Sequence, residues 1–171
     1  MRKLAVIIIN HRHSELLKKA VESLISMGVD QPFELFVINN LKDEQTKNWL
    51  TATVPGIRVL ENEHPLGFAS NINKIISNNS DYEYYLLLNP DVLCLPGMIE
   101  ALIEVMEADP QIGVAGPKLL DMDGTTQPSR RRFATFPVLM MRALHLDSIF
   151  KGLPAVDRYL MSQDTFEPIA E

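Results

Sequence analysis

Short apolar runs alternate with segments of helical periodicity along most of the chain, and this alternation limits the possible folds more than any other feature. Five runs have the length and character of buried strands, at residues 4–9, 34–38, 57–60, 84–88 and 114–120. Between them, apolar residues recur at helical spacing at residues 16–25, 43–50, 69–76 and 99–106. Strands that alternate with helices usually run in parallel. The sequence therefore predicts an α/β fold with a mostly parallel sheet flanked by helices.

Local signals set the expected ends of these elements. The run 4–9 is apolar at consecutive positions, which indicates a strand covered by helices on both faces. Ser14 is a suitable N-cap for the following helix, and Gly28 is a suitable C-terminal stop. Asn89-Pro90 ends the fourth strand, because proline cannot donate to a central ladder. The residues 121–124, Asp-Met-Asp-Gly, predict a turn after the fifth strand.

Size and charge exclude several classes of protein. A chain of 171 residues with 46% hydrophobic residues has enough apolar surface for one globular domain with an appended segment. Its net charge of -6 repels phosphate backbones, so nucleic acid is not an expected partner. The single cysteine, Cys94, cannot form an internal disulfide, which favours a reducing cytoplasmic environment.

The N-terminal apolar run is too short for a signal peptide and lacks a small-residue cleavage site. No other apolar run approaches the roughly 20 residues that a membrane span needs. These observations predict a protein that is soluble or at most peripheral. The expected location is the cytoplasm, either free or at the inner face of the cell membrane.

Polar residues follow four of the predicted strands. They are Asn10 and His11, Asn39 and Asn40, the loop before Gly67, and Asn89 to Asp91. In open α/β sheets, ligands bind beyond the carboxyl ends of the strands, so these residues are candidates for one binding crevice. The alternative is that each strand end is polar only because it meets water.

Several of these segments occur in a familiar order. They are Val6-Ile7-Ile8-Ile9-Asn10-His11, Phe36-Val37-Ile38-Asn39-Asn40, Leu66-Gly67-Phe68-Ala69 with Asn73, Leu87-Leu88-Asn89-Pro90-Asp91, Gly116-Pro117-Lys118-Leu119-Leu120, Asp123-Gly124, and Gln127 to Phe133. Together, from about residue 4 to residue 144, they resemble the family 2 glycosyltransferases with a GT-A, Rossmann-like fold, particularly the rhamnosyltransferase-like branch. The resemblance implies a nucleotide-sugar-binding domain at residues 1–144. It implies that residues 145–171 are a tail at the start of a missing acceptor-binding part.

The resemblance implies an inverting transfer of a hexose-like sugar from a nucleoside-diphosphate sugar to a glycan or lipid-linked acceptor, as in polysaccharide biosynthesis. The leaving diphosphate gains negative charge, which a divalent cation can stabilise. The family places an Asp-x-Asp-like element after the fourth strand, and here it reads Asn89-Pro90-Asp91. Asp91 is therefore the expected ligand of Mg²⁺ or Mn²⁺. The alternative is that these three residues only make a turn.

Other positions are expected to bind the nucleotide sugar, each with a simpler alternative. His11 matches an aromatic position that stacks on the base, or is a solvated loop histidine. Asn39 stands where the family usually has an aspartate, which leaves the choice between uridine and deoxythymidine open. Gly67 and Asn73 match positions near the diphosphate, or are a plain loop glycine and a solvated helix residue. Arg131, in the run 130–132, is a candidate phosphate ligand or part of a solvated charged surface.

The general base that the reaction needs is not recognisable. Nothing after Leu144 resembles the family's segment for it, and the tail carboxylates Asp157, Asp164, Glu167 and Glu171 lack that context. We therefore expect either a donor-binding fragment of a longer enzyme, inactive alone, or a shortened relative. The second hypothesis is a noncatalytic nucleotide-binding or scaffolding module with a GT-A-like fold. The apolar segment 136–144 predicts a buried helix or, if exposed, a surface for self-association or membrane contact.

Overall fold

The computed structural model describes residues 4–29, 32–129, 131–144 and 154–161. The chain divides into two compact units, residues 1–115 and residues 116–171. The first unit contains four strands and four helices in strict alternation. Their bounds are β1 Leu4–Asn10, α1 Ser14–Ser26, β2 Phe33–Asn39, α2 Glu44–Thr53, β3 Arg58–Glu61, α3 Phe68–Ile76, β4 Tyr84–Leu88 and α4 Met98–Ala108.

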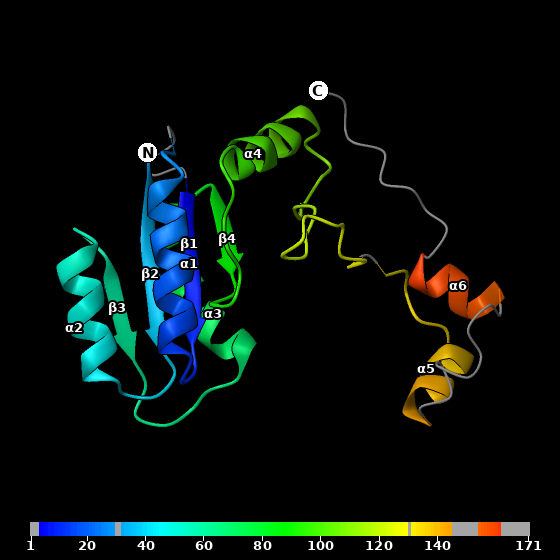
Figure 1. The fold of residues 1–171 in the computed structure, drawn as a ribbon, viewed down its shortest axis with the longest axis horizontal. Coiled ribbons are helices and arrows are strands. Elements are labelled where there is room, and N and C mark those ends of the chain that lie inside the picture. Colours follow the sequence, from blue (N-terminus) through cyan, green and yellow to red (C-terminus); the bar gives the residue numbers. More distant parts are fainter. Residues whose placement is uncertain (1–3, 30–31, 130, 145–153, 162–171) are drawn as a thin grey trace. The chain divides into compact units, whose positions relative to one another are not determined.

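The four strands form one parallel sheet in the order β3-β2-β1-β4 (Figure 1). β1 pairs on one side with β2, where Leu4 is opposite Phe33, and on the other side with β4, where Leu4 is opposite Tyr84. The strand order reverses between β1 and β4, which is where doubly wound sheets bind ligands. The expected α/β class with a parallel sheet flanked by helices is confirmed.

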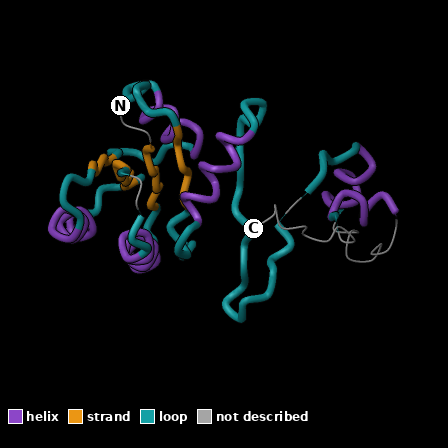
Figure 2. Tube along the Cα trace, turned by 90° about the horizontal axis from the view of Figure 1, so that it is seen from above, coloured by secondary structure: helices purple, strands orange, loops and turns teal. Residues whose placement is uncertain are grey.

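Helices cover both faces of the sheet (Figure 2). Leu17, Val21 and Leu24 of α1, with residues from α2 and α4, pack on the face that carries Val6 and Ile8 of β1. Ile75 of α3 packs on the opposite face. Because β1 is central and covered on both sides, almost every residue of this strand is buried. The expectation for the run 4–9 is therefore correct.

The predicted element ends agree closely with the structure. One predicted end, at the start of α1, and the predicted burial of the fourth strand need correction. Gly28 follows α1 with a left-handed φ of 66°, as expected of a helix stop, but Ser14 is the first helical residue and His13 is the N-cap. The fourth strand was expected to be buried. In the described part of the chain β4 is an edge strand, and Leu87 is 47% exposed. Only Leu88 of this strand is buried.

The predicted fifth strand at 114–120 is wrong. This segment contains no strand, and only an isolated antiparallel bridge joins Leu120 to Thr126. Gly116-Pro117 lies in its middle, where glycine weakens a strand and proline removes a ladder donor. Val114 is 91% exposed, so no packing compensates for these residues. The turn at 121–124 is present, with Gly124 N–H donating to the Asp121 carbonyl at 2.9 Å.

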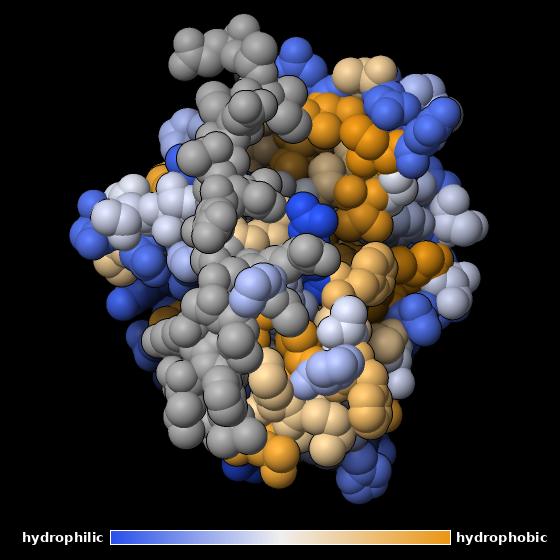
Figure 3. Space-filling view, turned by 90° about the vertical axis from the view of Figure 1, so that its right-hand side faces the viewer, coloured by the Kyte–Doolittle hydropathy of each residue, from blue (hydrophilic) through white to orange (hydrophobic). Residues whose placement is uncertain are grey.

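The second unit contains α5 Phe136–Ala143 and α6 Pro154–Leu160, which contact each other. The helix expected in the segment 136–144 is present, and of the two alternatives for it, buried or exposed, most of its side chains follow the second. Val138 is buried, whereas Phe136, Leu139 and Met140 are largely exposed. Apolar side chains of this helix therefore reach the surface. The space-filling view in Figure 3 shows hydrophobic surface, coloured orange, among the polar side chains of the face it draws. None of the described helices is long and apolar enough to span a bilayer.

Candidate nucleotide-binding site

The carboxyl ends of the strands meet at one edge of the sheet, the lower edge in Figure 1. The register places Asn10, at the end of β1, directly beside Asn39, at the end of β2. Their side chains are joined by a hydrogen bond in which Asn10 Nδ2 donates to Asn39 Oδ1 at 3.1 Å, and both residues are buried. The structure thus brings these two predicted site residues into contact.

Asn40 is the centre of a larger network. Its Nδ2 donates to the Leu66 carbonyl at 2.9 Å, and its Oδ1 accepts the Leu66 N–H at 2.8 Å. One side-chain amide therefore pairs with both sides of the Leu66 backbone, as a neighbouring strand would. This pairing holds the loop between β3 and α3 against the end of β2. His11 Nδ1 lies 3.5 Å from Asn40 Nδ2, so the exposed imidazole stands at the rim of the network.

Two buried asparagines that the sequence analysis missed complete the network. Asn62 Nδ2 donates to Asn40 Oδ1 at 2.9 Å and to Asn71 Oδ1 at 2.7 Å. Asn71 Nδ2 donates to Asn40 Oδ1 at 3.0 Å and contacts the Leu66 and Gly67 carbonyls at 3.2 Å. Lys74 Nζ donates to Asn62 Oδ1 at 3.1 Å. Asn62 directly follows β3 and lies in the loop before Gly67 that the strand-end rule had selected, but it was not singled out. Asn71 was detectable as an amide beside Ile72 and Ile75 on the buried side of α3.

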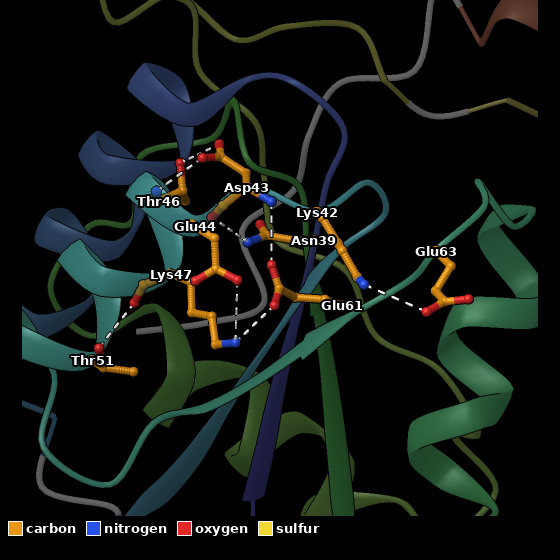
Figure 4. A network of polar contacts seen from close by, with 9 residues as sticks. All are labelled: Asn39, Lys42, Asp43, Glu44, Thr46, Lys47, Thr51, Glu61 and Glu63. Carbon is orange, nitrogen blue, oxygen red and sulfur yellow. Dashed lines mark hydrogen bonds and ion pairs between the residues drawn. The ribbon is translucent and has the colours of Figure 1, made fainter.

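A second polar network connects β2, α2 and β3 behind this edge (Figure 4). Asp43 caps α2 by accepting the Thr46 N–H at 3.0 Å, and it also accepts the Ser14 hydroxyl at 2.8 Å. The Asp43 N–H donates to Glu61, whose other oxygen is 2.8 Å from Lys47 Nζ. The Thr46 hydroxyl is the main cause of a lowered Asp43 pKa. The hydrogen bond from Lys47 is the main cause of a lowered Glu61 pKa.

Of the two residues expected near the diphosphate, Gly67 contacts the asparagine network and Asn73 is exposed. Gly67 is the N-cap of α3, and its carbonyl accepts the backbone N–H of Asn71 at 3.1 Å. It is therefore tied to the asparagine network. Asn73 is exposed on α3, and no contact with the predicted residues is seen for its side chain. On this helix Asn71, and not Asn73, is the asparagine that enters the network.

The Asn89-Pro90-Asp91 element forms a turn directly after β4, in which Val92 N–H donates to the Asn89 carbonyl. Because Ile8 pairs with Leu88, this turn lies at the same edge of the sheet as Asn10. Asp91 is exposed. Among the described residues there is no cluster of three or more His, Cys, Asp or Glu side chains that could hold a metal by themselves. A single accessible carboxylate suits a Mg²⁺-type ion that is shared with water and substrate phosphates.

Arg131 belongs to the second unit, where its Nη1 donates to the Pro128 carbonyl at 2.7 Å. Of the tail carboxylates, Asp164, Glu167 and Glu171 lie outside the described residues. Asp157 is one of the residues of α6. The described site thus comprises the strand ends of the first unit.

The model of one protein family, glycosyl transferase family 2, matches residues 5–158. The chain belongs to this family. The expected resemblance is thereby confirmed, and the strand-end network described above is part of a family 2 domain. The GT-A-like assignment of the parallel sheet agrees with the solved structures it resembles.

Among curated proteins, this family 2 chain is similar to the N-acetylglucosaminyl-diphospho-decaprenol L-rhamnosyltransferase of two Mycobacterium tuberculosis strains, CDC 1551 / Oshkosh and ATCC 25618 / H37Rv. Each match has 25% identity over 152 residues and covers 83% of this chain and 48% of the relative. The chain thus spans about half the length of the curated relatives it matches.

Among solved structures, S. aureus TarS 1–349 has a TM-score of 0.50 and 15% identity, over 62% of this chain and 32% of that chain. The complex of S. aureus TarS 1–349 with UDP-GlcNAc has a TM-score of 0.50 and 17% identity, over 62% of this chain and 31% of that chain. At these identities the likeness shows the shared fold.

Proposed function

We propose that this chain binds a nucleoside-diphosphate sugar at the carboxyl edge of its sheet and serves an inverting glycosyltransferase reaction. Membership of glycosyl transferase family 2 over residues 5–158 is the observation that carries this proposal. The connected side chains at the ends of β1, β2 and β3 support it, because ligands of open α/β sheets bind there. We propose residues 1–144 as the donor-binding domain.

The proposed donor contacts are those expected from the family, adjusted to the structure. We assign base stacking to His11, which is exposed at the rim, and a polar floor for the donor to the hydrogen-bonded pair Asn10 and Asn39. Gly67 lies at the start of α3, where its carbonyl accepts a hydrogen bond from Asn71 Nδ2 of the network at 3.2 Å. Asn73 on α3, Asn89 after β4 and Arg131 of the second unit are further proposed donor contacts. The choice of base is open because Asn39 offers an acceptor oxygen without charge.

Asp91 is the proposed ligand of Mg²⁺ or Mn²⁺. When bound, such an ion would stabilise the negative charge of the leaving diphosphate. The protein's own contribution is one exposed carboxylate fixed by the Asn89–Val92 turn after β4, at the edge that holds the asparagine pair. Because a single carboxylate binds a divalent ion weakly, we expect metal and nucleotide to bind together.

The proposed acceptor is a glycan or a lipid-linked saccharide. The curated relatives are named as transferases that act on a diphospho-decaprenol lipid, which supports a lipid-linked acceptor. The exposed apolar residues of α5 support a peripheral contact with the membrane that carries such a lipid.

The decisive test is nucleotide binding with the Asp91→Asn variant. Calorimetry with UDP, dTDP and GDP, with and without Mn²⁺, should show binding of at least one nucleotide that EDTA weakens. Asp91→Asn should weaken it as EDTA does, by about tenfold or more, while the thermal midpoint stays unchanged because Asp91 is exposed.

Asp81→Asn is the matched control, because Asp81 is also exposed but precedes β4 instead of following it. This variant should bind like the parent chain. Equal nucleotide affinity in the parent and in Asp91→Asn would refute the metal assignment. The absence of binding to every nucleotide would refute the donor site itself.

A further inference from the structure

Arg12 has a backbone conformation that its residue type disfavours. Its φ is 62°, in the left-handed region, where side chains with a Cβ are strained. In the described part of the first unit, every other residue with a positive φ is a glycine, namely Gly28, Gly56 and Gly97. Strain that persists in a folded protein is compensated by some other benefit of the residue.

The turn between β1 and α1 explains the conformation but not the choice of arginine. Three residues separate the end of β1 from the start of α1, and the His13 N–H must reach Asn10 Oδ1, which it does at 3.0 Å. A left-handed residue at position 12 makes this reversal possible. Glycine or asparagine would make the same turn with less strain. The turn therefore does not explain why position 12 carries an arginine side chain, and a role of that side chain would explain it.

The surroundings of Arg12 indicate an anionic ligand. Its side chain is exposed, and it forms no ion pair with any carboxylate in the described ranges. By contrast, Lys18, Lys42, Lys47 and Arg58 each have a glutamate partner. Arg12 directly follows His11 and the buried Asn10, so its cation is held at the same edge as the proposed donor floor.

We infer that Arg12 binds a phosphate group of the nucleotide donor. This inference rests on the proposed function and adds a residue to that site. A guanidinium donates two parallel hydrogen bonds to phosphate oxygens, which an ammonium cannot do. The left-handed backbone at residue 12 fixes the point just after β1 from which the side chain extends. Its positive charge would add to that of an ion held by Asp91 after β4, the strand beside β1.

The test separates the backbone of Arg12 from its side chain. Arg12→Asn and Arg12→Gly should raise the thermal midpoint of the full chain by about 2–5 °C, because the turn is relieved of strain. The same variants should weaken binding of the UDP, dTDP or GDP that the parent chain prefers by about tenfold or more. Binding of the matching nucleoside, which has no phosphate, should not change. Lys19→Asn, on α1, removes the same charge from an exposed helical position and should change neither quantity.

The outcomes are distinct. Unchanged nucleotide affinity in Arg12→Asn, with binding intact in the parent chain, would overturn the role of Arg12 but leave the proposed function standing. Equal losses for nucleotide and nucleoside would also overturn it, because they would indicate a disturbed site and not a lost phosphate contact. A lowered thermal midpoint would show that arginine is kept for stability. No nucleotide binding by the parent chain would overturn the inference and the proposed function together.

Discussion

Asparagine is an effective residue for joining strand ends, because each amide carries both a donor and an acceptor. Asn40 uses both groups on the same backbone residue, Leu66. Every amide of the network is buried, and no buried side-chain nitrogen or oxygen among the described residues lacks a partner. A fully satisfied polar network fixes a single arrangement, whereas a partly satisfied one is costly. The side chains that join the strand ends beneath the exposed His11 are thus neutral amides, with Lys74 as the charged residue that contacts them.

The first prediction concerns the centre of this network. Asn40→Ala removes the acceptor of the Leu66 N–H and of the Asn62 and Asn71 amides, so several buried donors lose a partner. Each unsatisfied buried group costs roughly 1–3 kcal/mol, and we expect a total loss of about 2–4 kcal/mol in the free energy of unfolding. Urea denaturation followed by circular dichroism measures it.

Asn73→Ala is the control for this variant, since Asn73 lies on α3 with Asn71 but is exposed. It should change the free energy of unfolding by less than about 0.5 kcal/mol. Amide hydrogen exchange gives a local measurement, in which the Leu66 N–H should lose protection in Asn40→Ala. A similar small effect of both substitutions on stability would contradict the central position of Asn40.

At the scale of single residues, the sequence allowed only part of this site to be predicted. Asn10 and Asn39 were found because a parallel register necessarily places neighbouring strand ends together. Asn71 was not named, because residues two positions apart on a helix face different directions and the motif does not specify which amide turns inward. The donor contact expected of Asn73 stays a prediction. The left-handed φ of Arg12 could not be predicted from the sequence either, since arginine rarely adopts this conformation.

At the scale of elements, α2 depends on its N-cap. Asp43 accepts hydrogen bonds from the backbone and hydroxyl of Thr46 and from Ser14 of α1, so one carboxylate fixes the start of α2 and ties it to a second helix. These hydrogen bonds hold the pKa of Asp43 below its ordinary value of 3.8. The folded state therefore binds fewer protons than the unfolded state near that pH.

The second prediction follows from the sign of this shift. The stabilisation by Asp43 is complete above pH 3.8 and is lost as the pH falls through the lower pKa of the folded state. Asp43→Ala should cost about 1–2 kcal/mol at pH 7. This difference from the parent chain should shrink below about pH 4, as measured by urea denaturation across pH 3–7.

The neighbouring acid provides the control for the cap. Glu44 is exposed in the first turn of the same helix and lies 4.0 Å from Lys47. Glu44→Ala should leave the urea midpoint nearly unchanged at pH 7. If Asp43→Ala were equally destabilised at pH 3 and at pH 7, loss of packing and not loss of the charged cap would explain its effect.

The elements themselves were largely predictable, and the exceptions have physical causes. Four strands and four helices of the first unit have the expected type because hydrophobic periodicity is strong in each. The segment 114–120 has the composition of a strand but contains Gly116-Pro117 and finds no ladder in the described part of the chain. The helix at Phe136–Ala143 forms as expected, but composition alone did not show that most of its apolar side chains would be exposed.

At the scale of the whole molecule, the division into two units is the main feature. The sheet, its helices and the asparagine network all lie in residues 1–115. Trp49, the only tryptophan of the chain, is in α2 of this unit, where it packs against the core and lies near Lys18. Its fluorescence therefore reports on the folding of the first unit.

The third prediction is that residues 1–115 fold without the rest of the chain. A truncated protein ending at Ala115 should unfold in urea in one cooperative transition, because its core is formed within the unit. The midpoint from Trp49 fluorescence should match that of the full chain within error, since both report the same unit. A truncated protein without a cooperative transition would show that the second unit is needed for the fold.

The strand order also has a consequence for how the molecule assembles. β1, β2 and β3 are joined by successive short helical connections, so they can pair as soon as they leave the ribosome. β4 must return past this nucleus to reach β1, as the pairing of Leu4 with Tyr84 requires. Closing the longer loop costs more entropy and comes later. Until β4 pairs with β1, the backbone N–H and C=O groups along one side of β1 are unpaired and can bind a strand of another chain. Misfolding should therefore begin at β1, and faster pairing of β4 should suppress it.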